Sequence, residues 1–153
     1  MPDYPYQPVE IDPQDRVLLE KIGWLRVLAW STYVPDARAR TPCLLDEHDG
    51  GARHWCVLHE GEPGAAARMS VHASLAEVPE PAVYLGVFAA PLPPPIASIN
   101  RLTIHPGFRG RGWTERLDDV RLSAAEGAGC GCVVVATPVP RRVEQLETRG
   151  FRV

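Results

Sequence analysis

The sequence has almost no lysine, few cysteines and no long hydrophobic run. Lys21 is the only lysine among the 16 basic residues, and the formal net charge is −3. This acidic balance argues against a general nucleic-acid-binding surface. No apolar run approaches the roughly 18 residues that a membrane-spanning helix requires. We therefore expect neither nucleic acid nor a membrane as a partner.

The spacing of the four cysteines does not suggest a metal site. Cys130-Gly131-Cys132 is a C-x-C, not a C-x-x-C, and no second pair follows at zinc-binding spacing. Cys132 leads into an apolar segment, where buried free thiols are common. We predict structural thiols and no metal.

Length and composition indicate one globular domain. A chain of 153 residues can bury a core of its own. Its hydrophobic fraction of 45% and charged fraction of 23% are ordinary for a soluble protein. The first five residues lack the basic and apolar regions of a signal peptide. We expect a single domain over residues 1–153 and a cytoplasmic location.

The most informative segment is a basic, glycine-spaced loop between a predicted strand and a predicted helix. A β-rich stretch over 99–104 reaches a turn at Pro106-Gly107 and continues into Arg109-Gly110-Arg111-Gly112. Glycine adopts positive φ without steric cost, so successive N–H groups can turn to one side. Such groups at a helix N-terminus, with arginines nearby, favour a phosphate or pyrophosphate. On this segment alone, an ordinary basic turn and a short nucleic-acid-binding patch stay open as alternatives.

The rest of the chain alternates between helical and strand patterns. Helical spacing of apolar residues predicts a helix from about Pro13 to Ser31, with Asp12 as its N-cap. Residues 33–51 are polar and irregular. The proline-interrupted segment 76–95 either shapes a substrate mouth or is a linker. Strands are predicted at 54–59, 65–73, 99–104 and 133–136, and helices after Trp113 and from Pro140.

This order of elements resembles the GCN5-related N-acetyltransferase (GNAT) superfamily. Its acyl-coenzyme A loop has the pattern Gln/Arg-x-x-Gly-x-Gly/Ala, which Arg109 to Trp113 fit and from which Thr114 departs. Leu146-x-x-x-Gly150-Phe151 fits as well. The resemblance implies an α/β fold with a mixed, mostly antiparallel sheet, flanking helices and splayed central strands. Only three residues remain from Phe151, so the sheet lacks its last strand, takes one from a partner copy in a homodimer, or belongs to a truncated chain.

The resemblance also implies a reaction, the transfer of an acetyl group from acetyl-CoA to the amine of a small-molecule or peptide acceptor by direct attack. Loop amides would hold the pyrophosphate of coenzyme A, and a strand N–H would polarise the thioester carbonyl. Val133 to Thr137 would form the opposite wall of the slot for the pantetheine arm. The residues implied in coenzyme binding are Leu102, Thr103, Ile104, Arg109, Gly110, Arg111, Gly112, Trp113 and Thr114.

The general acid and base expected from the resemblance are missing. Leu146 occupies the place where many GNAT enzymes have a tyrosine, and residues 97–100 contain no carboxylate. Candidate substitutes are His105, His72, Tyr84 or a water chain, although packing alone also explains each histidine. The alternative function is a non-catalytic or degenerate acyl-CoA-binding or regulatory module, and an RNA-contacting surface is a third.

Part of the chain is also similar to the N-acyl-homoserine lactone synthases, a GNAT-like group. The similarity rests on the order and spacing of five charged residues. Two features depart from it: Ser98 stands where a glutamate is expected, and those enzymes lack the basic glycine loop. It implies that the acidic pair and the arginines help to bind the amine substrate, and Arg68 is our substrate-side candidate. A solvated Asp-Gly turn is the alternative for the acidic pair. The matching residues are Arg26, Asp46, Asp49, Arg68 and Arg101.

Overall fold

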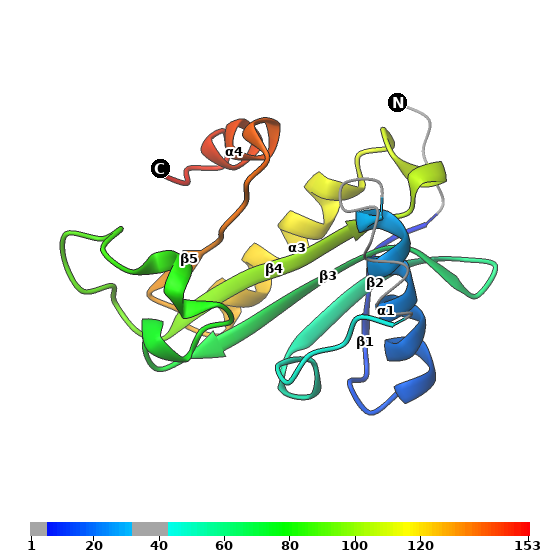
Figure 1. Ribbon diagram of the computed structural model, residues 1–153, viewed down its shortest axis with the longest axis horizontal. Helices are drawn as coiled ribbons and strands as arrows, with labels where there is room; N and C mark the ends of the chain where they lie inside the picture. The colour runs from blue at the N-terminus through cyan, green and yellow to red at the C-terminus, as the bar shows by residue number, and fades with distance from the viewer. Residues whose placement is uncertain (1–5, 32–42) are drawn as a thin grey trace.

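The computed structural model describes residues 6–31 and 43–153 (Figure 1). Residues 1–5, in which no signal peptide is expected, and residues 32–42, which include the first part of the predicted irregular segment, lie outside the described ranges. The helices are α1 (Arg16–Trp30), α3 (Trp113–Gly127) and α4 (Pro140–Glu147). The strands are β1 (Val9–Ile11), β2 (Arg53–His59), β3 (Glu62–His72), β4 (Ile96–Ile104) and β5 (Cys132–Val134).

The five strands form one sheet in the order β1-β2-β3-β4-β5. All neighbours are antiparallel except β4 and β5, which run parallel. Figure 1 shows α1 on one face of this sheet and α3 on the other. The predicted mixed, mostly antiparallel sheet flanked by helices is therefore confirmed. In the part of the chain that the structure describes, no strand follows β5.

Helix α1 begins later than its sequence pattern predicts. Its N-cap is Asp15, whose carboxylate accepts a hydrogen bond from the Leu18 N–H at 3.0 Å. Asp12 instead accepts from the N–H of Gln14 at 2.8 Å and closes a turn before the helix. Both aspartates satisfy free N–H groups, but only Asp15 does so at the spacing of a helix cap. The helix itself is confirmed over 16–30.

The two faces of the sheet carry different cores. Beneath α3 the core is mainly apolar, with Trp113 and Leu117 packed on alternate residues of β3 and β4 such as Met69 and Ile99, and Asp118 and Arg121 of α3 are buried as well. Beneath α1 a smaller apolar cluster contains Ile22, and buried charged side chains lie beside it. The alternation follows from the period of two in a strand.

The segment 76–95 is packed onto the sheet and is more than a linker. It contains two short 3₁₀ turns, Leu75–Glu77 and Pro81–Tyr84. Val78 and Tyr84 are buried against Ile96 of β4. The segment therefore adds a third, small core at the start of β4.

Candidate functional site

Strands β4 and β5 pair over only a short length and then separate, and we call the region between β4 and the chain that follows β5 the slot. The register joins Ile96 to Cys132 and ends at Ser98 with Val134, so it covers three of the nine residues of β4. Beyond Ser98, β4 runs on to Ile104 while the chain after β5 turns toward α4 (Figure 1). This separation matches the splayed central strands expected from the sequence.

A β-bulge interrupts the pairing of β4 with β3. Ala66 pairs with Thr103 and Arg68 with Asn100, so two residues of β4 lie opposite the single Ala67 of β3. Arg101, inside the bulge, has a positive φ of 53°. A non-glycine residue in this region is uncommon and costs energy, and bulges often occur beside functional sites.

The strand that follows the bulge turns one set of amides toward the slot. The N–H of His105 donates to the carbonyl of Gly64 at 2.8 Å, on the β3 side. Because the directions of the backbone N–H groups alternate along an extended strand, the N–H of Thr103 also points toward β3. The amide of Ile104, between them, then points away from β3, toward the slot.

The basic loop has the conformation that its glycines predict. Gly110 and Gly112 have φ values of +74° and +75°, and Gly112 is the N-cap of α3. A Cβ at Gly110 would meet no atom within 4 Å, so the loop is open on that side. The first N–H groups of a helix have no intrahelical acceptor and attract anions. Thr114 is half-buried, and Trp113 is buried, so its indole lies in the core while its backbone opens the helix.

Aromatic packing fixes the loop to the β2–β3 hairpin. A Cβ at Gly64 would lie 3.0 Å from the Phe108 ring, so this glycine allows the ring to lie on the backbone of β3. The guanidinium of Arg111 lies over the same ring at 4.8 Å and donates to the carbonyl of Gly107. Arg109 donates to the carbonyl of Ala29 at the end of α1. The loop is thus attached to both the sheet and α1.

Five charged residues meet on the α1 face of β3 and β4, and we call them the α1-face cluster. Arg26 forms two hydrogen bonds with Asp49, both 2.9 Å long. Arg68 bonds to Asp49 at 2.9 Å and to Asp46 at 2.5 Å, and Arg101 bonds to Asp46 at 2.8 Å. The cluster is Arg26, Asp46, Asp49, Arg68 and Arg101.

The second similarity found in the sequence had singled out these same five residues, and the structure brings them together. Asp49 is 2% exposed, so the alternative of a solvated turn does not hold for this residue. Arg68 is fully buried, whereas the side chains of Asp46 and Arg101 are 24% and 22% exposed. Only the last two can meet a ligand without rearrangement.

The arginines keep both carboxylates ionised. Burial alone would raise the pKa of Asp46, but the hydrogen bonds and charges of Arg68 and Arg101 outweigh it and hold that pKa far below its ordinary value. Burial would also raise the pKa of Asp49, but the hydrogen bonds and charges of Arg26 and Arg68 outweigh it and lower that pKa below its ordinary value. Both carboxylates are therefore ionised near neutral pH and are weak bases.

Two of the three candidate proton-transfer residues, Tyr84 and His72, lie on the same face of the sheet as the α1-face cluster. Tyr84 hydrogen-bonds Ser98, and Ser98 accepts from the Asn100 amide at 2.9 Å. Burial raises the pKa of the Tyr84 phenol, and the bond with Ser98 offsets part of the rise. His72 lies 2.8 Å from the Ser70 hydroxyl, and burial lowers its pKa.

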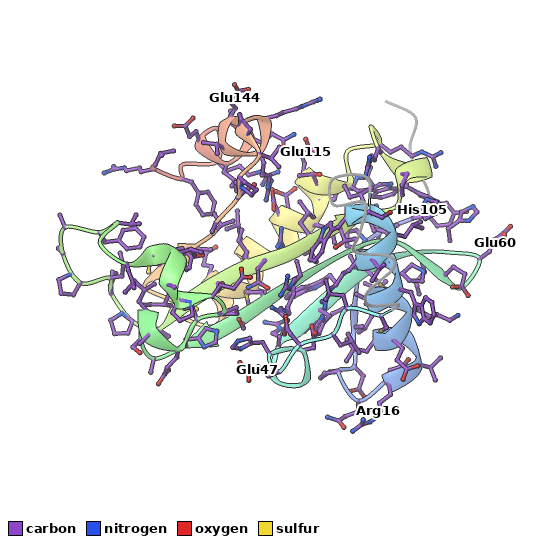
Figure 2. All side chains as sticks on the ribbon, in the orientation of Figure 1. Arg16, Glu47, Glu60, His105, Glu115 and Glu144 are labelled. Carbon is purple, nitrogen blue, oxygen red and sulfur yellow. The ribbon has the colours of Figure 1, made fainter. Side chains whose placement is uncertain are left out.

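His105, the third candidate, lies at the other end of β4 (Figure 2). Its Nδ1 accepts a hydrogen bond from the Gly107 N–H at 3.0 Å, and its ring contacts Phe108 edge-on. These contacts brace the turn before the basic loop. The structure therefore separates His105 from Tyr84 by most of the length of β4.

An open apolar hollow of about 450 Å³ lies between the segment 76–95 and the start of β4. No charged side chain lines it. The larger lining residues are Leu75, Tyr84, Leu85, Phe88, Leu92 and Ile96.

Metal and membrane sites have no counterpart in the described ranges. No group of three or more His, Cys, Asp or Glu side chains there could hold a metal ion, and the four cysteines are free thiols. No helix within 6–31 or 43–153 is long and apolar enough to cross a bilayer.

No protein-family model and no curated protein matches the chain, but solved structures do. A GCN5-related N-acetyltransferase from Ralstonia eutropha JMP134 matches with a TM-score of 0.63 at 15% identity, over 97% of this chain and 93% of that one. An aminoglycoside acetyltransferase from an uncultured soil metagenomic sample matches with a TM-score of 0.66 at 13% identity, over 98% and 93%. An aminoglycoside N-acetyltransferase in complex with CoA matches with a TM-score of 0.56 at 15% identity, over 96% and 92%.

Identities this low establish the fold alone. The chain has the GNAT fold over almost its whole length. The resemblance predicted from the loop and the order of elements is confirmed at that level.

Proposed function

We propose that the protein is an acyltransferase that moves an acetyl group from acetyl-CoA to the amine of a small-molecule or peptide acceptor. The observation that carries the proposal is the pairing of a left-handed glycine loop at the start of α3 with the separation of β4 from the chain after β5, which begins beyond Ser98 and includes the bulge of β4. Acetyl-CoA supplies an activated thioester. Because it is an intracellular metabolite, the proposal agrees with the expected cytoplasmic location.

The loop is suited to the pyrophosphate of coenzyme A. The amides from Gly110 to Thr114 lie at the positive end of the α3 dipole, and Arg109 and Arg111 add charge to the same turn. Open space around Gly110 leaves room for the phosphates to approach the backbone. We assign coenzyme binding to Arg109, Gly110, Arg111, Gly112, Trp113 and Thr114.

We assign the acyl end of the coenzyme to the backbone of Leu102, Thr103 and Ile104, where the Ile104 amide faces the slot. An N–H beside the thioester carbonyl stabilises the negative charge that grows on its oxygen, and this effect contributes most where water is excluded. The reaction forms a C–N bond and breaks the C–S bond, and the proton from nitrogen finally resides on the departing thiol. Much of the rate is then a matter of positioning.

The α1 face is the side from which we expect the acceptor to approach. Asp46 and Arg101 are the partly exposed members of its cluster and lie at the bulge. We assign the acceptor contact to these two residues, while Arg68, which is buried behind them, orients Asp46. The apolar hollow next to Tyr84 supports the view that the segment 76–95 shapes the mouth of this side.

Tyr84 is our candidate for the general acid. Its raised pKa keeps the phenol protonated at neutral pH, so it can donate to a leaving thiolate. His72, whose pKa is lowered, is neutral at that pH and is the candidate base that connects through Ser70 to the same face.

Calorimetric titration with coenzyme A and acetyl-CoA tests the first step. We expect saturable binding of both below about 1 mM. An amine panel that includes hydroxylamine, which is neutral at pH 7, then tests transfer by release of free thiol. Binding without transfer would identify the acyl-CoA-binding module instead, and no binding would overturn both functions.

A further inference from the structure

A buried arginine of α3 holds the bulge from the face opposite to the α1-face cluster. Arg121 is 1% exposed, and its Nη1 lies 3.3 Å from the carbonyl oxygens of both Arg68 and Asn100. These two residues are register partners directly beside the bulge. A bulge disrupts the hydrogen-bond ladder, and buried carbonyls near it need other donors. Arg121 is such a donor for one carbonyl on each strand.

The same arginine connects the bulge to the far side of the slot. Its Nη2 donates to Asp118 Oδ1 at 2.6 Å. Asp118, also 1% exposed, accepts two further bonds from Arg142 of α4, at 2.6 and 2.7 Å. Helix α4 follows β5 in the chain and stands apart from the sheet (Figure 1). A single chain of charge-assisted hydrogen bonds thus joins the β4 side of the slot to the element that follows β5.

Asp118 accepts hydrogen bonds from Arg121 and Arg142, and the Nε of Arg149 lies 3.8 Å from its Oδ2. Arg149 also bonds to Asp119 on the surface of α3. Burial lowers the pKa of Arg121 to about 10, against the opposing effect of Asp118. The guanidinium is therefore charged, and all of its hydrogen bonds persist, at neutral pH.

We propose that Arg121 is a positioning residue for the transfer reaction, which fixes the bulge on one side of the slot and, through Asp118 and Arg142, sets the distance to the other. The inference rests on the proposed function. Arg121 lies far along α3 from the loop that we assign to the pyrophosphate, so its loss should misplace the thioester without weakening coenzyme binding. A residue that serves only folding would not separate these two effects.

The experiment compares Arg121→Lys and Arg142→Met with Arg141→Met, a matched control on the exposed side of α4. Lysine keeps the charge but replaces the planar guanidinium, which bonds the carbonyls through Nη1 and Asp118 through Nη2, with a single ammonium nitrogen. The assay measures the transfer of the acetyl group from acetyl-CoA to hydroxylamine. In this reaction the acetyl C–S bond breaks, a C–N bond forms, and the proton lost from nitrogen passes to the released thiol. Calorimetry gives the coenzyme A affinity of each variant.

We expect Arg121→Lys to lower kcat about 10- to 100-fold, because small displacements of reacting groups cost this much. Arg142→Met should lower kcat less, while KM for acetyl-CoA and the coenzyme affinity stay within about threefold for both variants. Arg141→Met should stay within about twofold of wild type in every parameter.

Wild-type kcat in both Arg121→Lys and Arg142→Met would overturn the inference, and so would a parallel loss of kcat and coenzyme affinity. If Arg121→Lys does not fold, Arg142→Met decides alone, and a kcat equal to that of Arg141→Met contradicts the proposal. If the wild-type protein itself transfers no acetyl group to any amine of the panel, the proposed function is overturned, and the inference that rests on it falls as well.

Discussion

Buried arginines hold the bulge of β4 from both faces of the sheet, but the two groups differ in their access to solvent. On the α1 face, Asp46 and Arg101 are each more than one-fifth exposed. On the α3 face, Asp118 and Arg121 are each 1% exposed. The first group can meet a ligand, whereas the second can act only through the protein. Similar chemistry thus serves different purposes on the two faces, according to exposure.

The largest effect should come from the closed part of the α1-face cluster. Asp49→Asn removes the charge that faces the buried Arg26 and Arg68, and we expect the free energy of unfolding to fall by about 3–5 kcal/mol. The matched control is Asp119→Asn, which breaks an exposed pair with Arg149 and should cost about 0–1 kcal/mol. Urea unfolding measures both, and equal losses would erase the distinction between buried and exposed pairs.

The next effect concerns the loop. Gly112→Glu puts a Cβ at φ +75° and a carboxylate at the start of α3, so coenzyme A affinity should fall at least about 100-fold in calorimetry. Gly127→Glu, at the other end of the same helix in open space, should leave affinity unchanged. Retained binding in the first variant would place the coenzyme elsewhere.

A smaller effect on turnover should come from Tyr84→Phe, which tests whether the α1 face is the reacting face. Loss of the phenol proton should lower kcat about 10- to 100-fold with no change in coenzyme affinity. Tyr6→Phe, whose ring contacts His59, is the control. An unchanged kcat would contradict the role of Tyr84 as general acid and would indicate that its side chain serves only in packing.

The smallest effect is on acid stability. Because the folded pKa of Asp46 lies below its unfolded value, its contribution is complete above about pH 5 and is lost progressively as the pH falls further. Asp46→Asn should therefore show a shallower loss of unfolding free energy between about pH 5 and 2, by on the order of 1 kcal/mol. Glu47→Gln, at an exposed neighbour, should follow the wild-type curve.

The sequence predicts those parts of the fold that depend on local patterns. The conformation of Gly110 and Gly112 follows from glycine chemistry next to a helix, and α1 and α3 follow from apolar periodicity. Strand β1 escaped prediction because Val9–Ile11 is a three-residue edge strand whose pairing with β2 is long-range. The start of α1 was misplaced by three residues because two nearby aspartates both suit an N-cap.

The charged clusters show where local reasoning stops. Family similarity pointed to the α1-face residues, but nothing in their spacing revealed that Asp49 would be buried between two arginines. On α3, Asp118 and Arg121 are three residues apart and resemble an ordinary surface pair. Their role emerges only from the register of β3 with β4, which carries the carbonyls of Arg68 and Asn100 to Arg121.

The most direct test of the account is a crystal structure of the protein with coenzyme A bound. We predict the pyrophosphate at about 3 Å from backbone nitrogens between Gly110 and Thr114, with the pantetheine arm between β4 and the chain that follows β5. Phosphates bound anywhere else, or a loop whose amides turn away from them, would contradict the central claim.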